Sequence, residues 1–368
     1  MTAPKTTAPA TQTVYIGTYT PPGGRAEGVY VYRMDADGTL TRTHTAPCIS
    51  PSFVALSPRR DYLYAANRQA QTLYAVNETP EGEVSAYAVD ATNGSLMPLN
   101  RQPTHGVSPC HLVVDPTSRW LLVANYASGE FVVYPLSDGG EIGASSHIWR
   151  GEGQGANPRR QTGPHAHAVG FDPGGRFALG CDLGLDRTHV FRLDDTGHLT
   201  PNAAMPFASS APGAGPRHFA FHPGGRFLYV NNELDSTISA FAFDPDAGTA
   251  TALHSLPTLP DGFAGDNTTA EIAMHPTGRF VYVSNRGHDS IAMYAIDEAT
   301  GRLTALGNEP SGGREPRGFG VDPTGAFLLA GNQHTDTLVT FRIDAETGRL
   351  APTGQVTPVP SPVCVVFA

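Results

Sequence analysis

The stretch PGAGPRHFAFHPGGRFLYVNNELD, residues 212–235, contains the unit that the rest of the chain repeats. Two short runs, residues 217–221 and 227–230, are strand-like, and the second is aromatic and β-branched. Pro223, Gly224 and Gly225 lie between them and favour a hairpin turn, because proline presets φ and glycine accepts a positive φ. Arg217 lies at the start of the first strand of this hairpin, and Glu233 lies just after the end of the second strand. Both are therefore expected at the same end of an antiparallel pair.

The same unit recurs along the whole sequence. Each copy has a proline that ends the first run, an Asn or Asp nine residues later, a third apolar run and a Gly-x-Leu turn that opens a fourth run. The prolines are Pro58, Pro116, Pro173, Pro223, Pro276 and Pro323, and the polar residues are Asn67, Asn125, Asp182, Asn232, Asn285 and Asn332. The turn is clear at residues 38–40, 94–96, 197–199, 301–303 and 348–350, and weaker at 140–142 and 248–250. Seven copies result, at intervals of about 50 residues.

Four short antiparallel strands in each of seven repeats predict an all-β protein, a seven-bladed β-propeller. The chain opens on a second strand, residues 14–16, and ends on a spare first strand, residues 363–367. We expect these two to pair, which would close the ring and remove an open sheet edge. Two or three β-sandwich domains would not explain this complementarity of the ends. The expected organisation is a disordered N-terminal lead, residues 1–12, followed by a single propeller domain, residues 13–368.

Composition narrows the function. The net charge is −10, which argues against a nucleic-acid surface, and no apolar run is long enough to predict a membrane span. The four cysteines are far apart with no CxxC pair, and residues 1–13 lack the apolar core of a signal peptide. We therefore expect a cytoplasmic protein whose cysteines are reduced.

The repeat also predicts where a site lies. In a propeller, the first strand of each blade lines the central channel, and its start shares one mouth with the end of the second strand. The residues six before each aligned proline are Ser52, Cys110, His167, Arg217, Ala270 and Arg317; those ten after it are Arg68, Tyr126, Leu183, Glu233, Arg286 and Gln333; the first blade adds Tyr19. His111, His165, His218 and His288 lie within one or two residues of these positions. Four arginines facing one glutamate predict a cationic pocket for a small anion, such as a phosphate or a carboxylate.

Simpler interpretations remain open for each residue. Arg217 and Glu233 could form a structural salt bridge, and His167 could be a hydrogen-bonded core residue. His165 and His167 are spaced like a metal-ligand pair on a strand, but no third ligand has clear spacing, so no metal or other cofactor is expected. The repeated Asn and Asp residues are more typical of turns than of catalysis.

Three segments resemble a known family: HAHAVGFDPGGRF, GPRHFAFHPGGRFLYVNNELDSTIS and SNRGHDSIAMYAI. They are similar to the lactonase family of seven-bladed propellers, which includes propeller-type 6-phosphogluconolactonases and 3-carboxy-cis,cis-muconate lactonising enzymes. The resemblance covers nearly the whole chain. In the muconate enzymes the proposed active site is a histidine, two arginines and a glutamate, and the matching residues here are His167, Arg217, Glu233 and Arg286. His165 is an alternative for the histidine.

The resemblance implies chemistry at a lactone of a small anionic substrate. The first hypothesis is hydrolysis of a phosphorylated sugar lactone, with Glu233 or His167 as general base and Arg217 and Arg286 as oxyanion clamps. Arg68 and Arg317 would hold the phosphate or carboxylate, in a pocket completed by Tyr19, Tyr126, His165 and His218. The second hypothesis is a muconate-type cycloisomerase that uses the same residues. The third is a propeller without catalytic activity that binds a partner protein.

Overall fold

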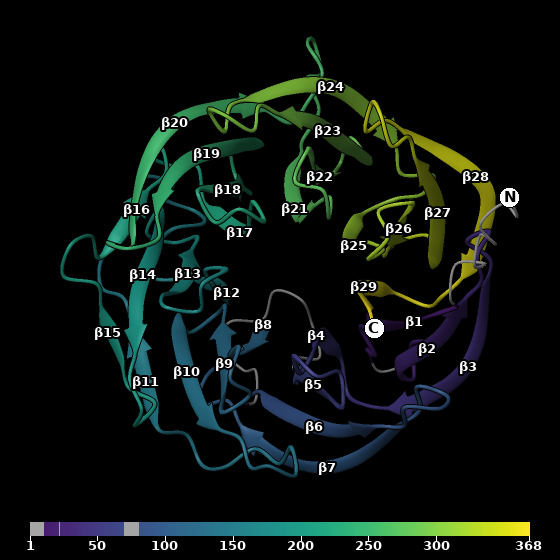
Figure 1. Cartoon of the computed structure of the whole chain (residues 1–368), viewed down its shortest axis with the longest axis horizontal. Helices are drawn as coiled ribbons and strands as arrows, with labels where there is room; N and C mark the ends of the chain where they lie inside the picture. The colour runs from purple at the N-terminus through teal and green to yellow at the C-terminus, as the bar shows by residue number, and fades with distance from the viewer. Residues whose placement is uncertain (1–10, 22, 70–80) are drawn as a thin grey trace, which may run out of the picture.

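The computed structural model describes residues 11–21, 23–69 and 81–368. Seven antiparallel sheets are arranged in a ring, with one strand of each sheet nearest the axis and another at the rim (Figure 1). The predicted seven-bladed β-propeller is therefore confirmed. The predicted lead falls almost entirely on residues outside the described ranges, but Gln12 already belongs to the first strand, one residue earlier than expected.

The blades are numbered along the chain, and their strands are given from the axis outward. Blade 1 is β29 (Pro362–Phe367), β1 (Gln12–Thr18), β2 (Gly28–Met34) and β3 (Leu40–Pro47); blade 2 is β4 (Pro51–Leu56), β5 (Tyr62–Asn67), β6 (Glu83–Val89) and β7 (Leu96–Pro103). Blade 3 is β8 (Pro109–Val114), β9 (Trp120–Asn125), β10 (Glu130–Pro135) and β11 (His147–Arg150). Blade 4 is β12 (Ala166–Phe171), β13 (Ala178–Asp182) and β14 (Arg187–Leu193), and its rim position is shared by two short strands that both pair with β14, β15 (Leu199–Pro201) and β16 (Phe207–Ser209). Blade 5 is β17 (Pro216–Phe221), β18 (Phe227–Asn232), β19 (Thr237–Asp244) and β20 (Thr249–Pro257); blade 6 is β21 (Thr268–Met274), β22 (Phe280–Arg286), β23 (Ser290–Ile296) and β24 (Leu303–Pro310). Blade 7 is β25 (Pro316–Val321), β26 (Phe327–Asn332), β27 (Thr337–Ile343) and β28 (Leu350–Pro358).

The two ends of the chain close the ring as predicted. Strand β29 pairs antiparallel with β1, and Ile16 lies opposite Val365. The backbone amide of Ala368 donates to Thr13, and that of Tyr19 donates to Ser361. The pairing gives blade 1 its innermost strand and leaves no sheet with a missing member.

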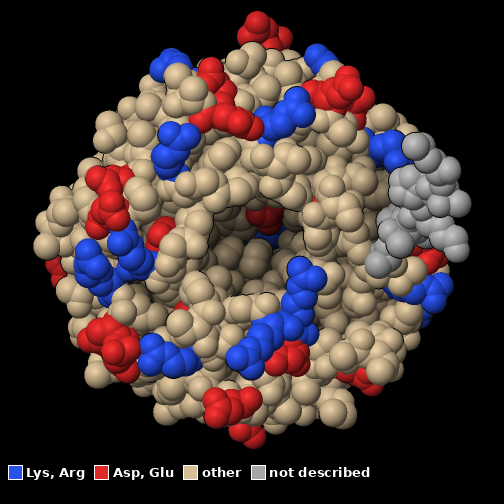
Figure 2. All heavy atoms as spheres, viewed as in Figure 1, with Lys and Arg blue, Asp and Glu red and all other residues tan. Residues whose placement is uncertain are grey.

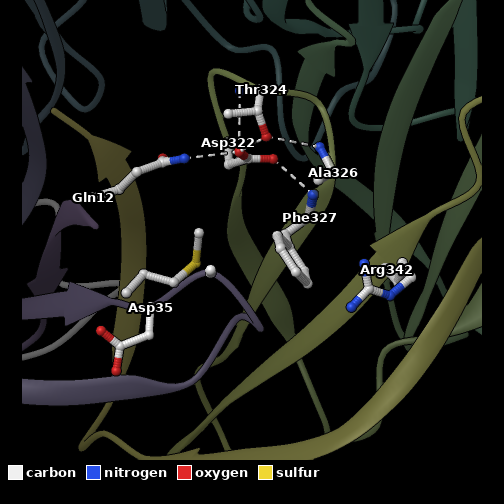
Figure 3. A pocket seen from close by; sticks show the side chains of 9 residues that line it. Gln12, Asp35, Asp322, Thr324, Ala326, Phe327 and Arg342 are labelled. Carbon is white, nitrogen blue, oxygen red and sulfur yellow. Dashed lines mark hydrogen bonds between the residues drawn. The ribbon is translucent and has the colours of Figure 1, made fainter. Parts of the chain in front are cut away.

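A side-chain contact adds to this closure at the hairpin end of the blades (Figure 3). Asp322 lies in the β25–β26 turn, where its Oδ1 accepts the backbone N–H of Phe327 at 2.7 Å. Its Oδ2 accepts the Gln12 amide from blade 1 at 3.0 Å. These groups border a cavity of about 200 Å³ between the first and last blades. The first residue of β1 is thus tied to the seventh blade.

The hydrophobic core is divided into layers between neighbouring blades. Val14 and Ile16 of blade 1 pack with Leu329 and Leu338 of blade 7, and equivalent clusters lie between each of the other neighbouring pairs. The second strand of a blade is covered on both sides; β18 is buried along its whole length. This explains why the second strands are mainly apolar, whereas a rim strand such as β28 mostly alternates partly buried and exposed positions.

The repeated turn glycines make specific contacts between blades. Tyr229 of blade 5 donates its hydroxyl hydrogen to the carbonyl of Gly301 in blade 6, and Tyr282 of blade 6 does the same to Gly348 in blade 7. Gly301 has a φ of +70°, and a Cβ there would lie 2.2 Å from the Phe227 ring. Glycine is required at this turn both by the backbone conformation and by the close approach of the neighbouring aromatic ring.

One predicted turn does not open a strand. Ile142 forms only an isolated bridge with Leu136, and the fourth strand of blade 3, β11, begins at His147. The reason is that Asn100 of blade 2 binds both backbone groups of Ile142, at 2.7 and 2.9 Å. The weaker copy at residues 248–250 does lead into β20.

Charges of both signs are spread over the face of the ring that surrounds the central hollow (Figure 2). Figure 2 shows one face of the ring, hollowed at its centre, with Lys and Arg side chains interspersed with Asp and Glu over the surrounding surface. In the described ranges, no helix has the length and apolar character needed to cross a bilayer.

Deletion of residues 361–368 tests the closure. We expect most of the stability to be lost, because the inner edge of β1 would be left unpaired and its apolar neighbours exposed. A matched pair of substitutions refines the test: Val365→Asp, in buried β29, should cost about 3 kcal/mol or more, whereas Val356→Asp, 54% exposed on β28, should change stability by about 0.5 kcal/mol or less. Urea unfolding measures both, and a truncated protein as stable as the full chain would contradict the closure.

Candidate active site

β-bulges present the predicted residues at the channel mouth. In five blades, the pairing of the first two strands skips one residue close to the start of the first strand: Ser52, Cys110, His167, Arg217 and Arg317. In blade 6 the shift is wider and skips both Ala270 and Glu271. A bulge bends the strand and re-aims the unpaired side chain. The residue six before each aligned proline therefore lies at an irregular point of the backbone in every one of these blades.

The mouth contains a cavity of about 270 Å³. Six of the ten predicted site residues line it: Arg68, Tyr126, His167, Glu233, Arg286 and Arg317. Six further residues complete the lining: Cys110, Arg160, Thr268, Glu315, Gln333 and His334. The other predicted residues, Tyr19, His165, Arg217 and His218, lie behind this first layer, as their contacts below describe.

Glu233 is the centre of the charge arrangement. Its Oε2 is 3.0 Å from Arg217 Nε and 3.1 Å from Arg286 Nη2, and its Oε1 is 2.6 Å from Arg160 Nη2. The carboxylate is only 7% exposed. Burial alone would raise the pKa of Glu233, but the charges of Arg286, Arg217 and Arg160 outweigh it and lower this pKa to about 2. Glu233 is therefore a stable anion with little tendency to accept a proton near neutral pH.

His167 has the opposite character. Burial, followed by the positive charge of Arg217 and the proximity of His218, lowers the pKa of His167 well below its usual value. Its imidazole is therefore neutral near pH 7. Nε2 lies 4.0 Å from Glu233 Oε2, and Nδ1 lies 3.8 Å from the Cys110 thiol. Burial raises the pKa of Cys110 to about 12, so this neighbour is a neutral thiol.

Arg217 is more enclosed than the sequence suggested. Besides Glu233, it donates through Nη1 to the carbonyl of Ala270 at 2.5 Å and to His218 Nε2 at 3.1 Å. The residue is 3% exposed and lies outside the cavity lining. These contacts suit a group that holds Glu233 better than one that clamps an incoming anion.

Arg317 is available to a ligand. Its guanidinium carbon lies 5.3 Å from the centre of the Tyr19 ring, and Arg68 approaches the same ring at 6.0 Å. No carboxylate of the described residues lies within ion-pair distance of Arg317. Tyr19 itself is 5% exposed, so it supports the arginines from behind the cavity. Burial would raise the pKa of its hydroxyl, but the charges of Arg317 and Arg68 lower it overall.

Of the two alternate histidines, only His167 lines the cavity. His165 stacks on the Tyr126 ring at 4.8 Å and makes a 2.9 Å hydrogen bond through Nδ1 to the Tyr126 carbonyl, so it orients Tyr126. His165 precedes β12 and His167 is the residue that its bulge skips, so the alternation of a regular strand does not apply to this pair. Within the described part of the chain, no group of three or more His, Cys, Asp or Glu side chains is arranged to hold a metal ion.

Sequence reasoning missed three charged residues. Arg160 comes from the irregular connection between blades 3 and 4, which carries no position of the repeat. Its guanidinium also donates to the Tyr126 hydroxyl at 3.1 Å. Glu315 lines the cavity, 3.8 Å from Arg286, and Glu271 lies beneath it next to His218. The expected single carboxylate is thus wrong, although arginines still outnumber glutamates around the site.

Residues 13–367 match the family model described as lactonase, seven-bladed β-propeller. The chain belongs to this lactonase family. It is 37% identical, over 309 residues and 84% of both chains, to a 6-phosphogluconolactonase of Bacillus subtilis. The family resemblance found in the sequence, and with it the prediction of an enzyme, is confirmed.

Solved structures of lactonase relatives agree with the fold along the entire chain. A putative 6-phosphogluconolactonase from Bacteroides fragilis superposes with a TM-score of 0.90 at 30% identity, covering 100% of both chains. A periplasmic gluconolactonase of Pseudomonas aeruginosa has the same score and identity and covers 98% of this chain and 99% of its own. Among these relatives, the named substrates include both a phosphorylated and an unphosphorylated gluconolactone.

The ion cluster predicts a stability role for Glu233. Glu233→Gln should destabilise the lactonase fold by about 3 kcal/mol or more, because buried Arg217 and Arg286 would lose their counter-charge. Because the folded-state pKa is lowered to about 2, the stabilisation is present above the ordinary glutamate value and is lost as pH falls towards 2. Urea unfolding at several pH values should therefore show the wild type and the variant converging in acid.

Glu130→Gln is the matched control. Glu130 is also a buried glutamate, but its partner Arg150 is 3.8 Å away and 60% exposed, so we expect a loss of less than about 1 kcal/mol. Equal effects of the two substitutions would contradict the central role of Glu233.

Proposed function

We propose that the protein hydrolyses a phosphorylated sugar lactone, with 6-phosphogluconolactone as the first candidate. The observation that supports this most directly is a neutral imidazole, His167, in a small cavity where arginines outnumber carboxylates. Hydrolysis of a lactone needs a base for water and cations for the oxyanion, and both are present there. The relative from Bacillus subtilis bears the name of this activity.

In the proposed reaction, His167 is the general base. It takes a proton from water as the water oxygen attacks the lactone carbonyl carbon, and the carbonyl oxygen becomes an oxyanion. The tetrahedral intermediate then collapses, the bond to the ring oxygen breaks, and the imidazolium returns its proton to that oxygen. Glu233 is too acidic for the base role, but its charge, 4.0 Å from His167 Nε2, stabilises the transient imidazolium.

The arginines divide into two groups in this mechanism. Arg286 and Arg160 lie beside Glu233 and line the cavity, so we assign to them the oxyanion and the substrate hydroxyl groups. Arg317, which no described carboxylate neutralises, is assigned to the substrate phosphate together with Arg68. Arg217 holds Glu233 in place from behind.

The cycloisomerase alternative uses the same constellation, since lactone formation also needs a proton carrier and carboxylate-binding arginines. A partner-binding propeller without activity would not require these charges to be buried in the channel. We further infer a cytoplasmic location, because the four cysteines are free, buried thiols. One relative is named periplasmic, so cell fractionation is the test that separates the two locations.

His167→Gln tests the base. Turnover of 6-phosphogluconolactone, corrected for spontaneous hydrolysis, should fall about 10²- to 10⁴-fold with little change in melting temperature. His198→Gln, at an exposed histidine of blade 4, is the control and should match the wild type. Because the pKa of His167 in the free protein is lowered, wild-type kcat/KM should stay level from pH 8 to pH 6.5 and decline only in more acidic buffer. A wild-type protein active on carboxymuconate and inactive on gluconolactones would overturn the assignment in favour of the cycloisomerase.

Arg317→Gln tests the phosphate site. KM for 6-phosphogluconolactone should rise about 10-fold or more, whereas KM for unphosphorylated gluconolactone should change little. The reason is that only the phosphorylated substrate has a phosphate for the Arg317 guanidinium to bind. Arg302→Gln removes an exposed arginine of blade 6 and serves as the control for net charge. An equal change for both substrates would place the phosphate elsewhere.

A further inference from the structure

A chain of buried hydrogen bonds continues below the cavity. Glu233 Oε2 accepts from Arg217 Nε, Arg217 Nη1 is 3.1 Å from His218 Nε2, and His218 Nδ1 is 2.8 Å from Glu271 Oε1. The His218 side chain is 5% exposed and that of Glu271 is 14% exposed. His218 and Glu271 lie outside the cavity lining, and the proposed mechanism gives neither a role.

The donors and acceptors in this chain have only one consistent arrangement. Arginine has no acceptor, so His218 Nε2 must accept the hydrogen from Arg217 Nη1. His218 Nδ1 then bears the proton and donates it to Glu271 Oε1. Glu271 is held in turn, since Oε1 also accepts the backbone N–H of Ile272 at 3.1 Å. The two hydrogens of Arg217 Nη1 are both used, because the other is donated to the Ala270 carbonyl.

Neighbouring rings restrict His218. The rings of His111 at 5.0 Å, His167 at 5.2 Å and Phe53 at 6.0 Å each meet it edge to face, and Phe53 also stacks on His111 at 3.9 Å. Burial, followed by the charges of Arg217 and Arg317, lowers the pKa of His218 well below its usual value, so the ring is neutral as the tautomer argument requires. Packing therefore holds the ring plane, and Arg217 and Glu271 together leave Nδ1 as the protonated nitrogen.

We propose that Glu271 and His218 are positioning residues for Arg217. Glu271 anchors the His218 ring by accepting from Nδ1, His218 Nε2 holds Arg217 Nη1, and Arg217 Nε is thereby directed at Glu233, beside His167. The inference deepens the proposed function and rests on it for its effect on turnover. The hydrogen-bond order itself does not depend on which reaction the site performs.

The tautomer gives a direct test that needs no substrate. In ¹⁵N-detected NMR of the full-length wild type at pH 8, His218 should show a protonated Nδ1 and an unprotonated Nε2. Its signals are assigned by their loss in His218→Gln. A protonated Nε2 on His218 would overturn the proposal, whether or not the protein proves to be a lactonase.

Kinetics of Glu271 variants test the effect on Arg217. Glu271→Ala should lower kcat about 10- to 100-fold with little change in KM, because misplacing Arg217 disturbs groups around the reacting atoms and leaves the phosphate contacts in place. Glu271→Gln keeps an acceptor oxygen for His218 and should retain most of kcat, which a residue that transferred a proton would not. Glu130 is a buried carboxylate outside this series of hydrogen bonds, so Glu130→Gln should have the kcat of the wild type.

A double substitution separates positioning from general stability. In an Arg217→Lys background, Glu271→Ala should cause no further loss of kcat, since the group through which Glu271 acts is already absent. Additive losses would overturn the proposal. If the wild type opens no lactone, the proposed function is wrong. The NMR result then tests the proposed hydrogen-bond order by itself.

Discussion

The fold depends on ring closure. Each blade has apolar side chains on both faces, so it is stable only when a neighbouring blade covers each face. An open row of seven blades would leave one apolar face at each end in contact with water. Pairing of β29 with β1 supplies the missing inner strand and lets blade 1 pack against both blade 2 and blade 7. Because closure uses the two ends of the chain, the last residues are as necessary to the core as any strand in the middle.

Closure also creates the site. A ring of seven first strands brings together residues that lie up to 250 positions apart, such as Arg68 and Arg317, and no local segment could do this. The bulges at the strand starts turn His167, Arg217 and Arg317 towards the axis. The rigid scaffold then holds several like charges close together, which needs the compensating carboxylate of Glu233.

The resulting charge pattern assigns different chemistry to groups that look alike in the sequence. Glu233 and Glu271 are both buried glutamates, yet three arginines make the first strongly acidic, whereas burial raises the pKa of the second to about 7. His167 remains neutral because burial, and then the positive charge of Arg217 beside it, lower the pKa of its imidazole. A neutral imidazole, an ionised carboxylate and Arg317, which forms no ion pair with a carboxylate of the described residues, thus lie around one cavity.

By itself, the sequence determined the number of blades, the strand order, the closing pair and the positions that meet at the mouth. These follow from a proline-to-asparagine spacing of nine residues, and such spacing is a local property of each hairpin. Only the tertiary structure decided which side chains face the cavity. Arg160 arrives from an irregular connection, which has no repeat to read, and Glu271 stands at the bulge of blade 6, where the pairing skips two residues of β21 instead of one. Arg217 is enclosed by Ala270 and His218, since bulge geometry and the packing of neighbouring blades, not strand alternation, set its direction.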